Sequence, residues 1–130
     1  MIRIAVSSVF VDDQERALRF YTDVLGFVTK HDIPVGDHRW LTVVSPAGPD
    51  GLERLLEPND NPAAKTFQAS IREQGIPATT FAVDDLRAEH ARMTELGVAF
   101  TVEPVAVEGS ALAVFDDTCG NLISLHQVLT

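Results

Sequence analysis

The chain has 130 residues and a formal net charge of −9, so it has the size of one ordinary domain and lacks the positive charge that binds nucleic acid phosphates. No apolar run approaches the roughly 18 residues of a membrane span, and the first residues resemble a strand rather than a secretion signal. The single cysteine, Cys119, excludes a disulfide within the chain, and we therefore expect a protein of the reducing cytoplasm.

The first half of the chain predicts a strand, a helix and three further strands. A strand of small residues at 6–13 ends in Val11-Asp12-Asp13, where an aspartate can cap the following helix. The helix is predicted over residues 14–25 and ends at Gly26, because glycine readily takes the left-handed conformation that closes a helix. Three strands are predicted at 27–31, 39–45 and 52–57, separated by turns rich in proline and glycine, the first of them at 34–36.

The second half repeats this order after a linker at residues 59–76, which is predicted to hold a helix between Asn61 and Gly75. A strand at 78–85 again ends in Val-Asp-Asp, a helix over 86–96 again ends at Leu-Gly, and three strands follow at 99–105, 111–115 and 122–128. The repeat predicts an α+β fold in one domain, built from two βαβββ modules at residues 1–58 and 77–130.

Three segments carry a resemblance to a known family. They are Val11-Asp12-Asp13, the helix exit Arg-Phe-Tyr-Thr-Asp-Val-Leu-Gly-Phe at 19–27, and the turn Asp-Thr-Cys-Gly-Asn at 117–121. Together they resemble the vicinal oxygen chelate superfamily, which includes glyoxalase I, bleomycin-resistance proteins and extradiol dioxygenases. The resemblance implies a half-open, eight-stranded mixed sheet that forms a cup, with helices outside and a ligand inside, and it implies a homodimer.

The resemblance also implies where a metal would bind. Enzymes of this superfamily hold a divalent metal with side chains on the first and last strands of each module. Here those positions fall on Val6, Ala78 and Ser124, and the fourth falls on Leu55 or, with a slip, on Glu53. Such side chains make a poor ligand set for a divalent cation, so we expect no metal and no other cofactor.

Strand alternation predicts what lines the cup instead, because alternate side chains share a face. If Val6 and Ala78 face the cup, neighbours in the same phase do so too, and Glu57 becomes the counterpart of His126 in the other module. Trp40 is a further candidate, for stacking on a ligand. The expected ligand-binding residues are Ser8, Phe10, Trp40, Glu57, Thr80, Ser124 and His126.

These observations favour a metal-free protein that holds a small organic molecule, with a cationic ligand as one candidate because the chain is acidic. An alternative is a metal-dependent lyase or dioxygenase with displaced ligands drawn from Glu53, Glu57 and His126. Others are an isomerase that uses Glu57 and His126 for acid–base chemistry, and a module without a ligand. The sequence leaves open whether the protein is an enzyme, which molecule it binds, and whether one chain or two form the cup.

Overall fold

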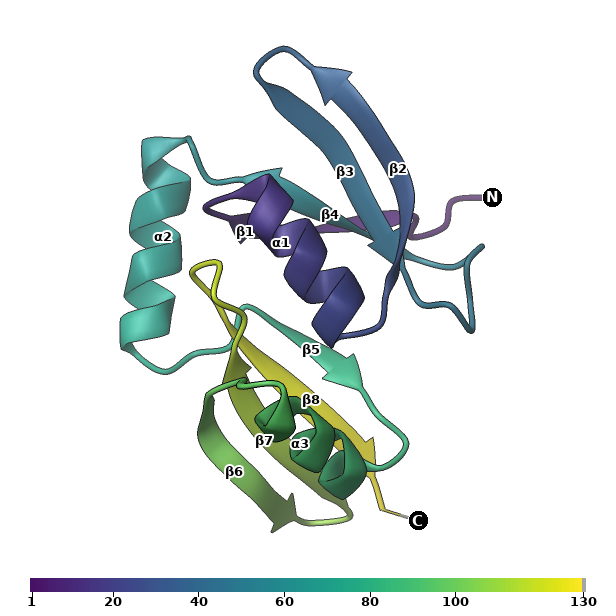
Figure 1. Cartoon of the computed structure of the whole chain (residues 1–130), viewed down its shortest axis with the longest axis vertical. Helices are drawn as coiled ribbons and strands as arrows, with labels where there is room; N and C mark the ends of the chain where they lie inside the picture. The colour runs from purple at the N-terminus through teal and green to yellow at the C-terminus, as the bar shows by residue number, and fades with distance from the viewer. Residues whose placement is uncertain (130) are drawn as a thin grey trace. The chain divides into compact units, whose positions relative to one another are not determined.

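The computed structural model describes residues 1–129, whose strands and helices follow the predicted order (Figure 1). The first module contains β1 (Val6–Val11), α1 (Gln14–Arg19), a π-helical turn (Phe20–Val24), β2 (Val28–Val35), β3 (His38–Val44) and β4 (Glu53–Pro58). After α2 (Pro62–Glu73), the second module contains β5 (Thr79–Ala82), α3 (Leu86–Glu95), β6 (Phe100–Val107), β7 (Ser110–Asp116) and β8 (Leu122–Val128). Within residues 1–129, every helix is too short or too polar to span a membrane.

Each module forms an open, mixed sheet of four strands. The strand orders are β1-β4-β3-β2 and β5-β8-β7-β6, with a parallel pair between the first and last strands of each module and antiparallel pairs elsewhere. This confirms the α+β class and the two βαβββ modules. By internal packing the chain divides into two compact units, Met1–Lys65 and the residues from Thr66 onward, with the boundary inside α2.

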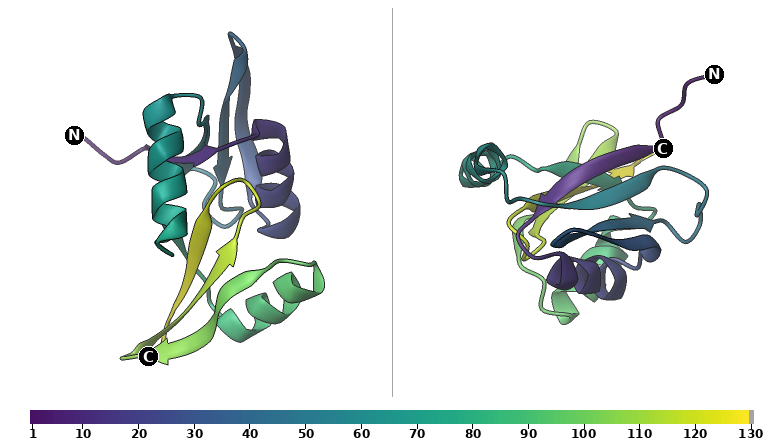
Figure 2. Two further views of the ribbon diagram at one scale, coloured as in Figure 1. Left: turned by 90° about the vertical axis from the view of Figure 1, so that its left-hand side faces the viewer. Right: turned by 90° about the horizontal axis from the view of Figure 1, so that it is seen from above.

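One face of each sheet packs against the helix of its own module (Figure 2). In the first module α1 lies against β3 and β4, and in the second α3 lies against β6, β7 and β8. The large apolar side chains between helix and sheet are almost fully buried and form the two cores: Val9, Val11, Tyr21, Leu41, Val43 and Leu56 in one, and Leu86, Met93, Phe115, Ile123 and Leu125 in the other. We call the opposite face of each sheet its inner face.

The repeated Val-Asp-Asp segments work as predicted. The carboxylates of Asp13 and Asp85 accept hydrogen bonds from the amides of Arg16 and Ala88, at 3.0 and 3.1 Å, and so cap α1 and α3. Gly26 and Gly97 follow the two helices with φ of 83° and 88°, a conformation that costs glycine little.

The helix of the first module differs from that of the second by a π-helical turn. The chain between Asp13 and Gly26 is one residue longer than the chain between Asp85 and Gly97. The amide of Leu25 bonds the carbonyl of Phe20, five residues back, at 3.2 Å, and this wider turn takes up the extra residue.

A β-bulge and a proline shape the edge strand β2. Thr29 pairs with Val43 but His31 pairs with Thr42, so Lys30 is an extra residue on β2. The predicted turn at 34–36 was wrong at its start, because β2 continues through Pro34 and the turn lies at residues 36–37. A proline fits there because an edge strand leaves some amide positions without a partner.

Candidate functional site

The first module places its predicted site residues on the inner face. Ser8 lies opposite Leu55 and Phe10 lies opposite Glu57 in the parallel pair of β1 and β4. Ser8 is exposed, whereas Phe10 and Glu57 are half-buried. Trp40 lies in the same phase on β3 and is 40% exposed.

The second module repeats this arrangement. Thr80 lies opposite Ser124 and Ala82 lies opposite His126 in the parallel pair of β5 and β8. Phe10 and Ala82 each directly precede the valine of a Val-Asp-Asp segment, so their partners, Glu57 and His126, occupy equivalent positions. The register therefore agrees with the counterpart predicted from the sequence, while ligand binding by these residues stays a prediction.

The predicted polar residues of the inner faces have no side-chain partner in the described part of the chain. Within residues 1–129, no side-chain hydrogen bond or ion pair involves Ser8, Glu57, Thr80, Ser124 or His126. Polar side chains that are half-buried usually find partners in the protein or in ordered water. These groups are therefore chemically available to a ligand.

The positions that resemblance assigns to a metal do not suit one. Ser8 pairs with Leu55 as Thr80 pairs with Ser124, so the fourth position is Leu55 rather than Glu53. Together with Val6 and Ala78, these positions supply a single hydroxyl. Glu53 and Glu57 lie four residues apart on β4, roughly 13 Å along a strand, which is too far to share an ion directly. In the described part of the chain, no group of three or more His, Cys, Asp or Glu side chains is arranged to hold a metal.

Glu53 belongs to a different cluster on the inner face of the first module. Its Oε1 accepts a hydrogen bond from Thr42 Oγ1 at 2.8 Å and lies 2.9 Å from His31 Nδ1. The hydrogen bond from Thr42, followed by that from His31, holds the pKa of the Glu53 carboxyl below its usual range. We call His31, Thr42 and Glu53 the His31 cluster.

The sequence pattern did not indicate His31 or Thr42 as site residues. Strict alternation from Thr29 puts His31 on the helix side, but the extra residue Lys30 turns it to the inner face. Thr42 is fully buried, and its neighbours on β3 are apolar. A single threonine within an apolar run is the one sequence signal that could have pointed to this position.

Arg54 makes a local contact within the first module. Its guanidinium lies on the helix side and donates to Ser7 Oγ at 3.0 Å. Burial lowers the pKa of this guanidinium below its usual range. Arg54 therefore adds no positive charge to the inner face.

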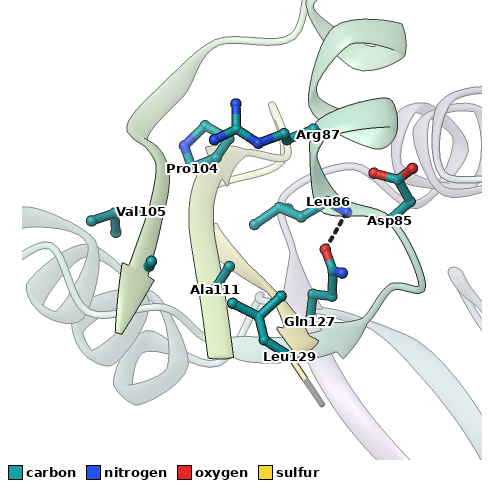
Figure 3. A pocket seen from close by; sticks show the side chains of 9 residues that line it. Asp85, Leu86, Arg87, Pro104, Val105, Ala111, Gln127 and Leu129 are labelled. Carbon is teal, nitrogen blue, oxygen red and sulfur yellow. Dashed lines mark hydrogen bonds between the residues drawn. The ribbon is translucent and has the colours of Figure 1, made fainter. Parts of the chain in front are cut away.

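A cavity of about 210 Å³ lies on the helix side of the second module, at the start of α3 (Figure 3). Apolar side chains such as Leu86, Ala111 and Leu129 line it. Gln127 also lines it, but its Oε1 accepts the amide of Leu86 at 2.8 Å and so serves the first turn of α3. None of the predicted ligand-binding residues contributes to this cavity.

Comparison with known proteins agrees with this fold. Residues 3–125 match the model of the Glyoxalase/Bleomycin resistance protein/Dioxygenase superfamily. The uncharacterized protein YurT of Bacillus subtilis (strain 168) is 53% identical, with 97% of this chain and 99% of YurT covered. The crystal structure of UcmS2 has a TM-score of 0.83 at 33% identity, covering 97% of this chain and 98% of UcmS2. TnmS3, an antibiotic binding protein from Streptomyces sp. CB03234, has a TM-score of 0.75 at 27% identity, covering 98% and 97% of the two chains.

Proposed function

The chain belongs to the Glyoxalase/Bleomycin resistance protein/Dioxygenase superfamily, and from that membership we propose that it binds a small organic molecule without using a metal. The observation that carries the proposal is the set of polar inner-face side chains without a partner in residues 1–129, which in the first module share their face with Phe10 and Trp40. The proposed contact residues are Ser8, Phe10, Trp40, Glu57, Thr80, Ser124 and His126.

The chemistry of the inner faces supports a binding role over metal-dependent catalysis. Val6, Leu55, Ala78 and Ser124 offer too few donors to hold a Lewis acid, so a lyase or dioxygenase of the usual metal-dependent kind lacks its ligand set. Hydroxyl groups and imidazoles beside apolar surface suit an organic ligand. The relative TnmS3 is an antibiotic binding protein, and a similar role here accords with that.

The proposed ligand is neutral or cationic. Glu57 contributes to the inner face a carboxylate that has no partner within residues 1–129, and the whole chain has a net charge of −9. An anionic ligand would be repelled by both. We further propose that the protein acts as a cytoplasmic homodimer, and the fully buried side chain of Cys119, a thiol rather than part of a disulfide within residues 1–129, accords with a reducing compartment.

Two measurements on the untreated full chain test the metal-free binding role. Elemental analysis of protein purified without chelator should give much less than one metal ion per chain. Thermal unfolding against a panel of cationic glycopeptides, aromatic compounds and α-ketoaldehyde–thiol adducts should find a stabilising compound, since a ligand at 100 times its Kd adds about 2.7 kcal/mol. Stoichiometric, tightly held metal would overturn the proposal, as would a panel without any stabilising member.

The contact residues are tested with the stabilising compound from this panel. The double substitution Glu57→Gln, His126→Ala should weaken a cationic ligand at least tenfold, because two polar contacts are lost. Glu95→Gln, an exposed change on α3 with the same loss of charge, is the matched control and should leave affinity unchanged. Equal affinity of the double variant and the control would remove this pair from the site.

A further inference from the structure

The hydrogen bonds of the His31 cluster determine which nitrogen of the His31 ring carries a proton. The amide of His31 donates to Thr42 Oγ1 at 3.2 Å, and the Thr42 hydroxyl donates to Glu53 Oε1 at 2.8 Å. An ionised carboxylate only accepts hydrogen bonds, so the contact of 2.9 Å between Glu53 and His31 requires the proton on Nδ1. A neutral His31 imidazole therefore has its lone pair on Nε2.

This Nε2 atom is accessible and unused. The His31 side chain is 42% exposed, and the contacts of its ring within residues 1–129 involve Nδ1 alone. Thr42, by contrast, is fully buried, and the Glu53 side chain is 16% exposed. Glu53 thus holds Nδ1 of the His31 ring on the buried side, and Nε2 is left as a hydrogen-bond acceptor on the exposed side.

An aromatic surface lies beside this acceptor. Trp40 pairs with Ile33 across β2 and β3, and His31 pairs with Thr42, so Trp40 is the diagonal neighbour of His31 on the same face. Diagonal neighbours in an antiparallel pair lie about 7–8 Å apart, which is within reach of one aromatic ring system. Trp40 and Ile33 are 40% and 49% exposed, so both offer apolar surface.

The charges of this face select against an anion. No inner-face position of the described strands β1 to β4 carries a lysine or arginine, while Glu53 and Glu57 both lie there. Arg39 and Arg54 lie on the helix side, bonded to Asp32 and Ser7 respectively. Lys30, in the bulge, donates to the carbonyl of Pro49. A ligand group that meets this face gains more as a hydrogen-bond donor than as an acceptor.

We propose that the His31 cluster binds the hydroxyl group of an aromatic ligand, with His31 Nε2 accepting the O–H proton and Trp40 packing on the ring. The inference rests on the proposed binding function and names its ligand class, an uncharged phenol. His31 and Trp40 contact the ligand, whereas Glu53 and Thr42 position His31.

The test titrates 2-naphthol and 2-methoxynaphthalene into the full chain at pH 7.5. In the second compound a methyl group replaces the hydroxyl proton, so only the first can donate a hydrogen bond. The wild-type protein should bind 2-naphthol about tenfold more tightly, the effect of one hydrogen bond. His31→Phe keeps an aromatic ring and should abolish the preference, and Glu53→Gln should reduce it severalfold. Glu95→Gln, with the same charge change on exposed α3, should retain it.

A second readout separates positioning from general structural damage. Imidazole ¹⁵N NMR of the wild-type protein at pH 8 should show the His31 proton on Nδ1, and Glu53→Gln should shift it toward Nε2 while the other histidines stay unchanged. The inference is overturned if His31 carries its proton on Nε2, if the preference survives in His31→Phe, or if 2-naphthol does not bind. Stabilisation by another compound of the panel would then leave the binding function standing without this hydroxyl site.

Discussion

Single residues decide the geometry of the turn between β7 and β8. Asp117 is fully buried, and its carboxylate accepts hydrogen bonds from the amides of Cys119 and Asn121 and from the Asn121 side chain, at 2.7, 3.0 and 2.8 Å. Gly120 has φ of 102°, and a Cβ atom there would lie 2.6 Å from Gln68 Nε2. The turn thus requires glycine for its backbone and for its contact with α2.

Gly120→Ala should lower the free energy of unfolding by about 2–3 kcal/mol. The side chain forces the backbone strain of a positive φ on alanine and displaces the Gln68 amide from Cys119 O and Asn121 Oδ1, which lie 3.3 and 3.0 Å away. Gly36→Ala is the control, because Gly36 has φ of 60° with open space around it, and it should cost only about 1 kcal/mol. Equal losses in urea denaturation of the two variants would show that the Gln68 contact is unimportant.

At the scale of elements, an ion pair joins α2 to β7. Arg72 donates to Asp116 Oδ2 at 2.7 Å. Burial alone would raise the pKa of the Asp116 carboxyl, but the hydrogen bonds from Arg72 and from the Thr118 amide outweigh it and hold this pKa below its usual value of 3.8. The stabilisation is therefore present above pH 3.8 and is lost as the pH falls through the lower pKa of the folded state.

Arg72→Met should therefore destabilise the protein in a pH-dependent way. At pH 6 we expect a loss of about 0.5–1 kcal/mol, because both side chains are about a third exposed and solvent screens the pair. The difference from the wild type should shrink as the pH falls below 4. Arg87→Met is the control, since Arg87 is exposed and unpaired within residues 1–129, and should show little effect at either pH. Denaturant unfolding of both variants at several pH values measures this difference. If Arg72→Met loses the same free energy of unfolding at every pH, the loss does not come from the ion pair with Asp116.

The edge strands β2 and β6 expose apolar side chains, and each contains a proline. Ile33 and Val35 on β2 and Val105 and Val107 on β6 are each more than 40% exposed, and each strand contains one proline, at 34 and 104. Exposed apolar edges invite pairing with other chains, and a residue without an amide proton weakens that pairing.

Pro34→Thr together with Pro104→Thr should make the protein aggregate. Each change restores an amide donor to an edge strand and adds a residue that favours β-structure. Size-exclusion chromatography at rising loading concentration should show more high-mass material than for the wild type. Pro46→Thr, in the exposed turn after β3, should behave as wild type. If the double variant shows no more aggregate than this control, the prolines do not protect the edges.

The sequence predicted elements better than it predicted local irregularities. Repetition and alternation located the strands, the capping aspartates and the phase of Ser8 and Thr80, because each depends on neighbouring residues. The π-helical turn and the bulge at Lys30 were not predicted, because each adds one residue without a distinctive composition. The bulge alone moved His31 to the inner face, so its cluster with Glu53 was not predicted.

At the scale of the whole molecule, we expect a homodimer. Several large apolar side chains outside the two cores and outside the proposed ligand contacts are more than a third exposed, among them Phe67, Val105, Val107 and Leu129. Exposed apolar surface commonly marks an interface. Light scattering of the eluted protein should give twice the chain mass of 14.2 kDa. A mass that stays at that of one chain at micromolar concentration would contradict the prediction.

The extra helical residue in the first module bears on how such proteins change over evolution. An insertion within a β-strand reverses the facing of all side chains beyond it, whereas a widened helical turn confines the disturbance to itself. The strand β1 before residues 20–24 keeps the phase of β5, and at the start of the next strand Thr29 faces the helix side as Phe100 does in β6. A change of one residue in the length of this helix should therefore leave the facing of the neighbouring strand positions unchanged.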